Sequence, residues 1–544
     1  MAFSWNYGDI LDAIEQVVPG DRPALIHGDR VIDWRSFGRR TNNLAAALLR
    51  LGAAPGDKIA FYMRNRAEYS EAIAAAFKAR LTHVNVNYRY VDNELIYLLD
   101  NSDAAVVVYA AEFAPRVASI RAELPRVRAW IEVDDGHPGD SAALRYEDLV
   151  GQGSGARLDI SRSGDDLLFL YTGGTTGMPK GVMWRLDDLW RVTGAGGNPR
   201  LGIPPAQDLA EFVERVRNDA PPVNLPLPPL MHGTGLLAAA GAFARGGTCI
   251  TLAGRSYDPV EALTAIDRHR VTGVTIVGDA FAAPMVNALD AHPGRFDFAS
   301  VRMINSSGVM WTRAVKAGLL RHNPELVLVD AFSSSEAIGL GSSIMTRDQE
   351  IEVAKFTLGP TCKVFTEDFR EVLPGSGESG MVAVSGNLPV GYYKDEAKTA
   401  KTFPVINGVR YSIPGDWVRV EHDGSLTLLG RGSNCINTAG EKVYPEEVEE
   451  ALKHHPAVFD ALVVGLPDEK WGQSITAVVQ LRPGAGFDEA ALRGFVHERL
   501  AGYKVPKRIL VRDDLERAPN GKANYALIRE FALHQVSGAA QAAG

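Results

Sequence analysis

The most informative part of the sequence is LLFLYTGGTTGMPKGVMW, at residues 167–184. Its first residues are apolar and predict a buried strand that leads straight into a loop of glycines and threonines. Glycines allow a tight loop whose backbone N–H groups can face an anion, the threonines add hydroxyl donors, and Lys180 adds a positive charge. This composition suits a polyphosphate, although a plain turn between two strands also fits it. The loop is not a P-loop, because that motif needs Gly-Lys-Ser/Thr opening a helix, whereas Lys180 lies between Pro179 and Gly181.

On both sides of this loop, helical and extended patterns alternate along the chain. Short apolar runs predict strands at residues 57–63, 83–88, 104–110, 273–279, 301–308 and 326–336. Apolar residues at helical spacing predict helices at 36–52, 68–80 and 92–102. This order of strands and helices favours an α/β fold with a parallel sheet covered by helices.

Three later regions have a different character. Residues 185–225 are rich in glycine and proline around one helical segment, which predicts an inserted excursion over the surface. Closely spaced turns between residues 363 and 430 indicate a small β-rich unit. After Gly430 a small α+β pattern begins, with a helix predicted to start at Pro445. We therefore expect a large N-terminal body at 1–431, made of two α/β subdomains plus the β-rich unit, and a small mobile C-terminal α+β domain at 432–544.

Composition excludes several classes of protein. The 544 residues include 57 basic and 66 acidic ones, and the net charge of −9 offers no basic footprint for nucleic acid. The N-terminus shows no secretory signal, and no apolar run has the roughly 18 residues of a membrane span. Cys249, Cys362 and Cys435 are widely spaced and predict packing thiols in a reducing compartment. We expect a soluble cytoplasmic protein, and a homodimer stays open.

The run YTGGTTGMPKG, at 171–181, resembles almost letter for letter the phosphate loop of the adenylate-forming superfamily. That superfamily includes acyl-CoA synthetases, the adenylation domains of nonribosomal peptide synthetases, and beetle luciferases. The resemblance covers roughly residues 10–530. It implies that Lys180 is a catalytic cation and that the phosphates of ATP are bound by Thr172, Gly173, Gly174, Thr175, Thr176 and Gly177.

A second motif, DAFSSSEAIG at 330–339, resembles the aromatic-Gly-x-Thr-Glu segment of the same superfamily. The resemblance implies that Phe332 lies against adenine and that Glu336 holds Mg²⁺ on the phosphates, a role that suits a carboxylate. It also assigns nucleotide-binding positions to Asp330, Ala331 and Ser335. The sequence departs from the motif with Ser333 in place of glycine and Ser335 in place of threonine, and both substitutes are small.

The C-terminal motifs complete the resemblance. Asp416 matches the aspartate that binds ribose, a sensible role for a carboxylate that can accept from both hydroxyls, and Arg431 matches the arginine that opens the interdomain hinge. The hinge residue proper is Ser433, where the superfamily usually has Asp or Lys. In ERAPNGKANYALIRE, at 516–530, Lys522 matches the catalytic lysine, which would stabilise charge as it develops on the α-phosphate.

The second nucleophile and the acyl substrate distinguish the branches of the superfamily. The resemblance is to acyl-CoA synthetases, in which Gly440 and Lys442 would contact coenzyme A. The acyl group would lie near His232, Gly308, Ala337 and Gly339, with Gly308 also beside the nucleotide. The sequence looks most like the branch acting on medium- or long-chain fatty acids or bulky sterol-type carboxylic acids. Segment 185–225 would either cover the acyl channel or decorate the surface.

Other functions stay open as alternatives. An amino-acid adenylating enzyme would normally show an aspartate near position 232, and the stretch LPPLMHGTGLLAAAG has none. A luciferase-like oxygenase is a further enzymatic alternative. A non-catalytic nucleotide-binding paralogue is the alternative outside catalysis, and the presence of Lys522, Glu336, Asp416 and Arg431 argues against it.

Overall fold

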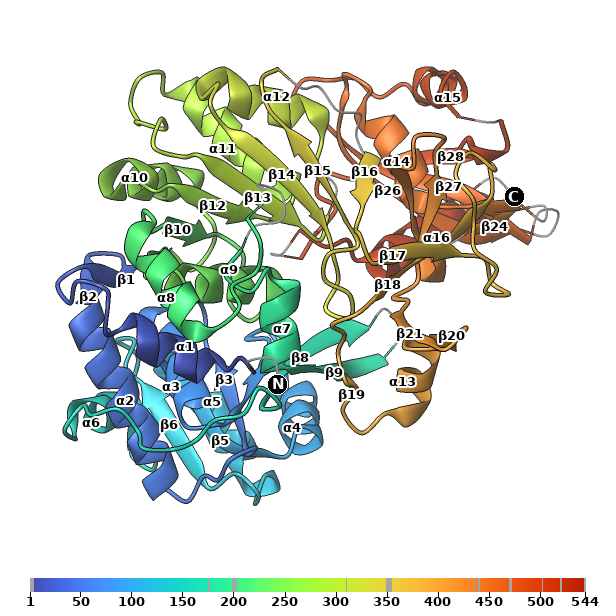
Figure 1. Cartoon of the computed structure of the whole chain (residues 1–544). Helices are drawn as coiled ribbons and strands as arrows, with labels where there is room; N and C mark the ends of the chain where they lie inside the picture. The colour runs from blue at the N-terminus through green and yellow to red at the C-terminus, as the bar shows by residue number, and fades with distance from the viewer. Residues whose placement is uncertain are drawn as a thin grey trace. The chain divides into compact units, whose positions relative to one another are not determined.

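The computed structural model describes residues 4–542 except 175–176, 198–202, 310, 349–354, 435, 439–440, 469–471, 501 and 519–520. The chain divides into two compact units (Figure 1). The first unit comprises residues 1–353 and 384–412, and the second comprises 354–383 and 413–544. The predicted boundary at 431/432 falls inside the second unit, because the β-rich residues group with the C-terminal ones.

The phosphate-loop motif lies in a mixed sheet of the first unit. Its strands, in spatial order, are β19 (Gly391–Tyr392), β9 (Gly177–Arg185), β8 (Leu167–Gly174), β4 (Thr82–Asn85), β3 (Lys58–Tyr62), β5 (Ala104–Ala110), β6 (Ala129–Val133) and β7 (Leu144–Arg145). The pairs from β8 to β7 are parallel, whereas β9 pairs antiparallel with both β8 and β19. Continuous apolar runs such as AAVVVYA form its buried central strands, as a parallel sheet covered on both faces requires.

A second, mainly parallel sheet completes the first unit. Its strands in this unit follow the order β2 (Arg30–Asp33), β1 (Pro23–His27), β11 (Thr248–Thr251), β10 (Val223–Pro226), β12 (Gly273–Ile276), β13 (Met303–Ser307), β14 (Val327–Phe332) and β15 (Gly341–Met345). The outer pairs β1–β2 and β14–β15 are antiparallel. A hairpin at the far end of the same sheet joins β20 (Val405–Ile406) to β21 (Val409–Ser412). Strands β13 and β14 are parallel neighbours, so the residues that follow them emerge at the same edge.

Helices cover both sheets, as the alternating pattern predicts (Figure 1). Asp33 caps α2 through a hydrogen bond from the Ser36 N–H of 2.7 Å, which explains why this helix starts just before the predicted position. The helices of the first unit are α1 (Tyr7–Ile14), α2 (Trp34–Arg50), α3 (Ala67–Lys78), α4 (Asp92–Asn101), α5 (Ala114–Ile120), α6 (Tyr146–Gly151), α7 (Leu186–Val192), α8 (Leu209–Asn218), α9 (Gly233–Phe243), α10 (Pro259–His269), α11 (Asp279–Ala291), α12 (Arg313–His322) and α13 (Glu396–Thr402).

The segment at 185–225 differs in part from the predicted surface excursion. Its C-terminal end leads into β10, which lies between β11 and β12 inside the sheet. In α8, Phe212 is buried, and its ring contacts Trp5 and Trp190 with centroid distances of 5.9 and 5.2 Å. The local sequence, rich in glycine and proline, did not predict this packing, because the aromatic residues that form it are far apart in the chain.

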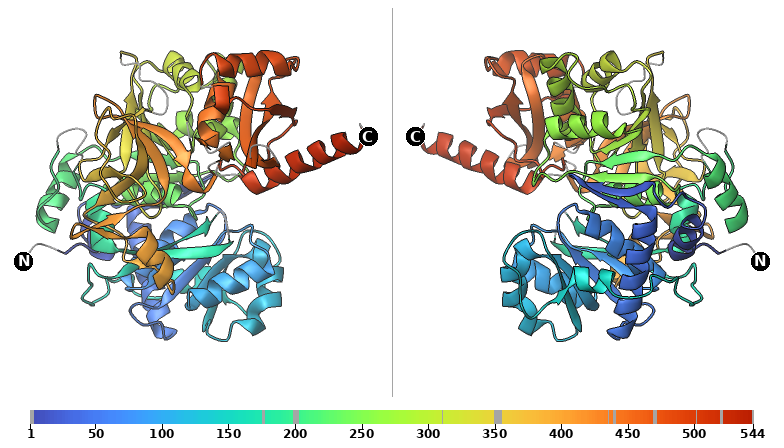
Figure 2. Two further views of the ribbon diagram at one scale, coloured as in Figure 1. Left: turned by 90° about the vertical axis from the view of Figure 1, so that its right-hand side faces the viewer. Right: turned by 90° about the vertical axis from the view of Figure 1, so that its left-hand side faces the viewer.

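The second unit contains an antiparallel β-rich part and an α+β part. The β-rich part consists of β16 (Lys355–Leu358), β17 (Cys362–Phe365), β18 (Ser379–Ser385), β22 (Asp416–Val420) and β23 (Leu426–Arg431), and β18 runs on into the first unit. The α+β part comprises β24 (Ile436–Thr438), β25 (Glu441–Val443), α14 (Pro445–Lys453), β26 (Val458–Asp468), β27 (Gly472–Leu481), α15 (Glu489–His497), β28 (Arg508–Val511) and α16 (Tyr525–Ala542). Helix α16 starts against β26, burying Ile528, and then runs beyond the sheet (Figure 2).

Two general predictions from the sequence concern the cysteines and membrane-spanning helices. Cys249 and Cys362 are buried free thiols, and burial raises the pKa of each to about 12, so both pack as predicted. Cys435 lies outside the described residues. Within the part of the chain that the structure describes, no helix has the length and apolarity needed to cross a bilayer.

Candidate active site

The phosphate-loop motif forms a β-hairpin rather than a strand-to-helix turn. Strands β8 and β9 pair antiparallel from Leu167 opposite Arg185 to Gly174 opposite Gly177, with a register shift between Thr172 and Gly174. Thr172 lies directly opposite Lys180, so the two side chains leave the hairpin on the same face. Of the tip residues, Thr175 and Thr176 lie outside the described residues.

Lys180 is held by a carboxylate that the sequence analysis did not single out. Its Nζ lies 2.5 Å from Oδ2 of Asp395, and the other oxygen of that carboxylate accepts from the Lys398 N–H at 2.9 Å, capping α13. The hydrogen bond from Lys180 holds the pKa of Asp395 below its usual value, and Asp395 raises the pKa of Lys180 in turn. The loop therefore presents a cation whose counter-ion comes from a distant part of the chain.

Glu336 follows β14 and is fixed at both its main chain and its side chain. Its Oε1 accepts a hydrogen bond of 2.8 Å from the hydroxyl of Tyr392, and its carbonyl accepts one of 2.7 Å from Ser412 Oγ. The carbonyl of the preceding residue, Ser335, accepts from Nε1 of Trp184 on β9 at 2.9 Å. These bonds bring the predicted metal carboxylate and the phosphate-loop strand into one cluster.

Neighbouring strand ends supply the rest of the predicted nucleotide positions in the first unit. Ser307 of β13 pairs with Ala331 of β14, so Gly308 and Phe332 emerge together at the carboxyl edge of parallel strands, where α/β sheets bind ligands. Gly308 has φ +96°, and among the described residues an added Cβ would meet only Val277 Cγ1, at 3.9 Å, so these residues leave open space beside it. Gly339, with φ +82°, likewise has no atom of the described part of the chain within 4 Å of an added Cβ.

Asp330 has a different environment from the other predicted nucleotide residues. It is buried on β14 and accepts a hydrogen bond of 3.2 Å from Lys316 Nζ on α12, with which it forms a buried ion pair. The pair joins α12 to β14 two residues before Phe332.

His232 lies where strand β10 leads into α9, and it occupies the N-cap position of that helix. Its main-chain neighbours are fixed: Asn85 Nδ2 donates to the Met231 carbonyl at 2.7 Å, and the Leu230 N–H donates to Asn65 Oδ1 at 2.7 Å. The partly buried imidazole therefore stands on a rigid turn. Ala337, the remaining predicted acyl contact, is buried in a turn. Its N–H donates a hydrogen bond of 3.1 Å to Ser334 Oγ, which closes the turn.

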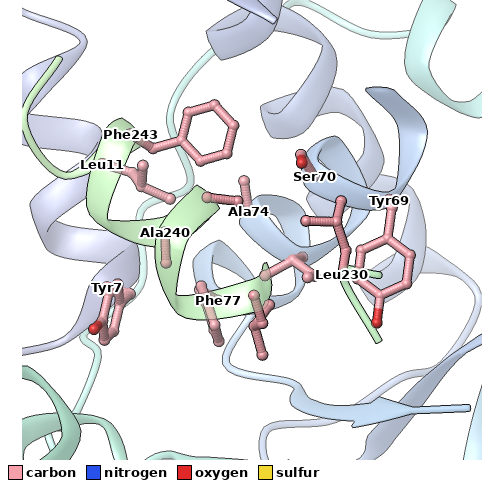
Figure 3. Close-up of a pocket in the computed structure, with 12 residues that line it drawn as sticks. Tyr7, Leu11, Tyr69, Ser70, Ala74, Phe77, Leu230, Ala240 and Phe243 are labelled. Carbon is pink, nitrogen blue, oxygen red and sulfur yellow. The ribbon is translucent and has the colours of Figure 1, made fainter. Parts of the chain in front are cut away.

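An apolar cavity lies between α1, α3 and α9 (Figure 3). Its volume of about 20 Å³ has room for about one water molecule. Ser70 lines it, and its buried Oγ makes no hydrogen bond to any residue that the structure describes. The cavity is too small for an acyl chain, and none of His232, Gly308, Ala337 and Gly339 lines it, so it is separate from the predicted acyl site.

The second unit carries the remaining predicted residues. Asp416 is buried at the start of β22, directly opposite Arg431 at the end of β23. Lys522 is exposed in a loop whose main chain is closed by Ala518 N–H to the Lys522 carbonyl at 2.9 Å. Lys442 belongs to β25, where only its backbone pairing with Asn437 is described. Gly440 lies outside the described residues.

A partly buried charged cluster supports the loop of Lys522. Arg517 makes two hydrogen bonds to Asp460, at 2.6 and 2.9 Å, and its Nη1 donates to the carbonyl of Gly521 at 3.3 Å. Beyond the loop, the hydroxyl of Tyr525 donates to Oε2 of Glu449 at 3.2 Å. Burial raises the pKa of Glu449 to about 7. The loop is thus held on both sides, through Arg517 and Tyr525 of the motif, by two carboxylates outside it, Asp460 and Glu449.

The donor set decides what kind of metal the site fits. Among the described residues, no three His, Cys, Asp or Glu side chains gather into a cluster that could hold a metal. Mg²⁺ is usually bound by one or two carboxylates together with substrate phosphates, and Glu336 offers one such carboxylate. Only its Oε1 has a hydrogen-bond partner in the described part of the chain. The residues therefore fit a cation that arrives with a nucleotide.

Comparison with known proteins identifies the family. Residues 13–393 match the family model described as AMP-binding enzyme, and residues 447–522 match the AMP-binding enzyme C-terminal domain. A 3-oxocholest-4-en-26-oate–CoA ligase of Rhodococcus rhodochrous is 41% identical over 96% of this chain and 94% of its own. A medium/long-chain-fatty-acid–CoA/3-oxocholest-4-en-26-oate–CoA ligase of Mycobacterium tuberculosis is 41% identical over 97% of this chain and 96% of its own.

A solved structure confirms the fold. The anthranilate CoA ligase AuaEII, crystallised with anthranoyl-AMP, superposes with a TM-score of 0.83 at 22% identity, covering 99% of each chain. At this identity the likeness concerns the fold alone, and it confirms the predicted α/β class with its large body and small C-terminal domain. The family models and the two relatives confirm the resemblance seen in the motifs. The chain therefore belongs to the AMP-binding enzyme family, whose members include the CoA ligases that it is similar to.

Proposed function

We propose that this protein is an ATP-dependent acyl-CoA ligase. A carboxylate would attack the α-phosphorus of ATP to give an acyl adenylate and pyrophosphate, and the thiol of coenzyme A would then displace AMP to give the thioester. The observation that carries this proposal is the cluster in which Lys180, on the phosphate-loop hairpin, and Glu336, after β14, lie on elements joined by direct hydrogen bonds. A cation and a carboxylate fixed next to a Gly/Thr loop form a receptor for a metal-bound polyphosphate.

The residues divide the work of phosphoryl chemistry, which depends on positioning and neutralisation of charge. Lys180 and the hairpin tip hold the phosphates, and Phe332 covers the adenine. Asp416 binds the ribose, while Arg431 and Lys522 contribute positive charge from the second unit. Lys522 would balance the charge that develops on the α-phosphate and on the attacking carboxylate.

Mg²⁺ bound with the nucleotide would neutralise phosphate charge, and Glu336 is the residue that would hold it. No general base is needed for the first step, because a carboxylic acid is already ionised at neutral pH. His232 is therefore assigned to packing against the acyl group rather than to proton transfer. For the second step, Gly440 and Lys442 are proposed to contact coenzyme A.

The acyl substrate is proposed to be a medium- or long-chain fatty acid or a sterol-type acid. The two relatives named for such substrates match almost the whole chain, which favours a shared substrate class. The open spaces beside Gly308 and Gly339 are consistent with a bulky acyl group near the reacting carboxylate. A side chain at either position would narrow that space and would also strain a backbone with positive φ.

A panel assay tests the proposal. The purified protein is given Mg·ATP with short, medium and long fatty acids, sterol acids, aromatic acids and amino acids, each with and without coenzyme A. We expect pyrophosphate release with fatty or sterol acids and thioester only when coenzyme A is present. Lys522→Ala should abolish pyrophosphate release while ATP still binds, whereas Lys507→Ala, an exposed lysine of the same unit, should behave as wild type. If no acid led to pyrophosphate release although ATP was bound, the result would contradict the proposal and favour a non-catalytic paralogue.

A further inference from the structure

The hydroxyl of Tyr392 connects two parts of the nucleotide site that are separate in the sequence. Tyr392 donates a hydrogen bond of 2.8 Å to Oε1 of Glu336, the carboxylate assigned to the metal. The backbone of the same tyrosine pairs with Val182 of β9, two residues beyond Lys180 on the phosphate-loop hairpin. A single residue therefore joins the carboxylate to the strand that carries the loop.

The side chain of Tyr392 is held in place by its surroundings, so its hydroxyl can fix the orientation of the Glu336 carboxylate. Its residue is only 4% exposed, and its N–H donates to Thr399 Oγ1 at 2.9 Å. Its ring packs against that of Phe403, with centroids 5.9 Å apart, and the ammonium of Lys398 lies 4.4 Å from the ring centroid on α13. Such packing limits the ring to one position and spares the hydrogen bond the entropic cost of ordering it.

The carboxylate, in contrast, would have rotational freedom without this bond. The carbonyl of Glu336 is fixed by Ser412, but its side chain is partly exposed, and Tyr392 makes the hydrogen bond that orients it. A hydrogen bond to one carboxylate oxygen sets the plane of the group and leaves Oε2 for a cation, in the way that outer groups orient metal ligands elsewhere.

We propose that Tyr392 is a positioning residue that orients Glu336 toward the divalent cation carried by the nucleotide phosphates. This inference rests on the proposed function, since it assumes that the site takes metal-bound ATP. It assigns Tyr392 no contact with substrate: the residue acts through Glu336. Its loss should therefore weaken the contribution of the metal to ATP binding and leave binding of metal-free ATP unchanged.

Calorimetry separates these two quantities. ATP is titrated into the full chain without an acyl substrate, once with EDTA and once with excess Mg²⁺, for wild type and Tyr392→Phe. Phenylalanine keeps the ring packing and removes only the hydroxyl. We expect equal affinities in EDTA and a reduction of the Mg²⁺-dependent gain in affinity by about tenfold, as befits one hydrogen bond to a charged acceptor.

A neighbouring tyrosine provides a matched control. Tyr393 donates a hydrogen bond of 2.7 Å to a different carboxylate, Asp103. Tyr393→Phe removes the same kind of bond from the next residue in the chain, and it should leave both affinities unchanged. An equal loss of the Mg²⁺-dependent gain in Tyr393→Phe and Tyr392→Phe would show a general effect on the segment and would overturn the inference.

A double substitution tests whether Tyr392 acts through Glu336. In a Glu336→Gln background, Tyr392→Phe should have no further effect on the Mg²⁺-dependent gain. A persisting effect, or an unchanged gain in Tyr392→Phe alone, would overturn the inference and leave the proposed function intact. Failure of the wild type to bind Mg·ATP would instead contradict the proposed function itself. A thermal melt of each variant checks that the fold is retained, and Glu336→Gln alone must reproduce the loss if a phenylalanine variant is unstable.

Discussion

Replacing Asp395 with asparagine should tighten the binding of ATP. The carboxylate of Asp395 lies 2.5 Å from the ammonium of Lys180, so it competes with the nucleotide phosphates for that cation. Its negative charge also repels the phosphates. Asparagine is as good a helix N-cap as aspartate, so the bond from the Lys398 N–H that starts α13 should persist. The substitution thus removes the charge and keeps the local fold.

The size of the effect follows from the exposure of the pair. The side chains of Lys180 and Asp395 are 35% and 18% exposed, so water screens their attraction, and the pair is worth about 1 kcal/mol. Freeing the ammonium should therefore lower the dissociation constant of ATP by about fivefold. Calorimetry with ATP in EDTA measures this directly, and added salt should shrink the difference between the proteins.

A cycle with Lys180→Ala tests the assumed partner. Once Lys180 is absent, Asp395→Asn should change the dissociation constant much less, because there is no ammonium left to release. If Asp395→Asn bound ATP more weakly than wild type, Asp395 would assist Lys180 instead of competing with the phosphates for it, contrary to this prediction.

The same pair makes a prediction about pH. Lys180 lowers the pKa of Asp395. The contribution of Asp395 to the stability of the fold is therefore present above its unfolded pKa and is lost as pH falls through the lower folded value. The pKa of Lys180 is raised by Asp395, so its contribution is present below its ordinary pKa and is lost as pH rises through the folded value. The ratio of the ATP dissociation constants of wild type and Asp395→Asn should therefore stay constant across neutral pH. A change of this ratio with pH in that range would contradict an ion pair.

Three further predictions concern other parts of the chain. Asp460→Asn should loosen the Arg517 contact that supports the loop of Lys522 and lower the rate of pyrophosphate release by about tenfold at unchanged ATP affinity, because it weakens one charged hydrogen-bonded pair; an unchanged rate would rule out this support. The raised pKa of Glu449 means that the folded state binds more protons than the unfolded one, so stability should fall as pH rises from the ordinary carboxyl pKa toward about 7. Glu449→Gln should flatten that dependence in thermal melts, and an unaltered pH profile would count against it. Ser70→Ala removes a buried hydroxyl without a partner in the described part of the chain and should stabilise the fold by about 1 kcal/mol, seen as a higher melting temperature with normal turnover; a lower melting temperature would show that the hydroxyl is satisfied.

Contiguous motifs led to the candidate residues of the first unit. The phosphate loop and the segment of Phe332 and Glu336 each carry their signal within a few residues, and apolar runs place both at strand ends. The α/β architecture followed from the same alternation of strands and helices. Local sequence is sufficient for such features, because the residues that define them are neighbours in the chain.

Tyr392 and Asp395 could not be found in this way. Tyr392 contacts Glu336 across 56 positions, and Asp395 contacts Lys180 across 215. The strand that brings them there, β19, has two residues and shows no periodicity of its own. The only local signal was the aspartate before α13, which predicts a helix cap and nothing more. Segment 185–225 was misjudged in part for the same reason, since the aromatic partners of Phe212 lie elsewhere in the chain.

An isotope experiment tests whether the carboxylate attacks the α-phosphorus of ATP. A fatty or sterol acid labelled with ¹⁸O in both carboxylate oxygens is incubated with the protein, Mg·ATP and coenzyme A, and the products are analysed by mass spectrometry. We expect one ¹⁸O in AMP and one in the thioester carbonyl, with unlabelled pyrophosphate, because the bridging oxygen of the adenylate leaves with AMP. Label in inorganic phosphate together with ADP would contradict it, since that outcome requires attack on the terminal phosphorus.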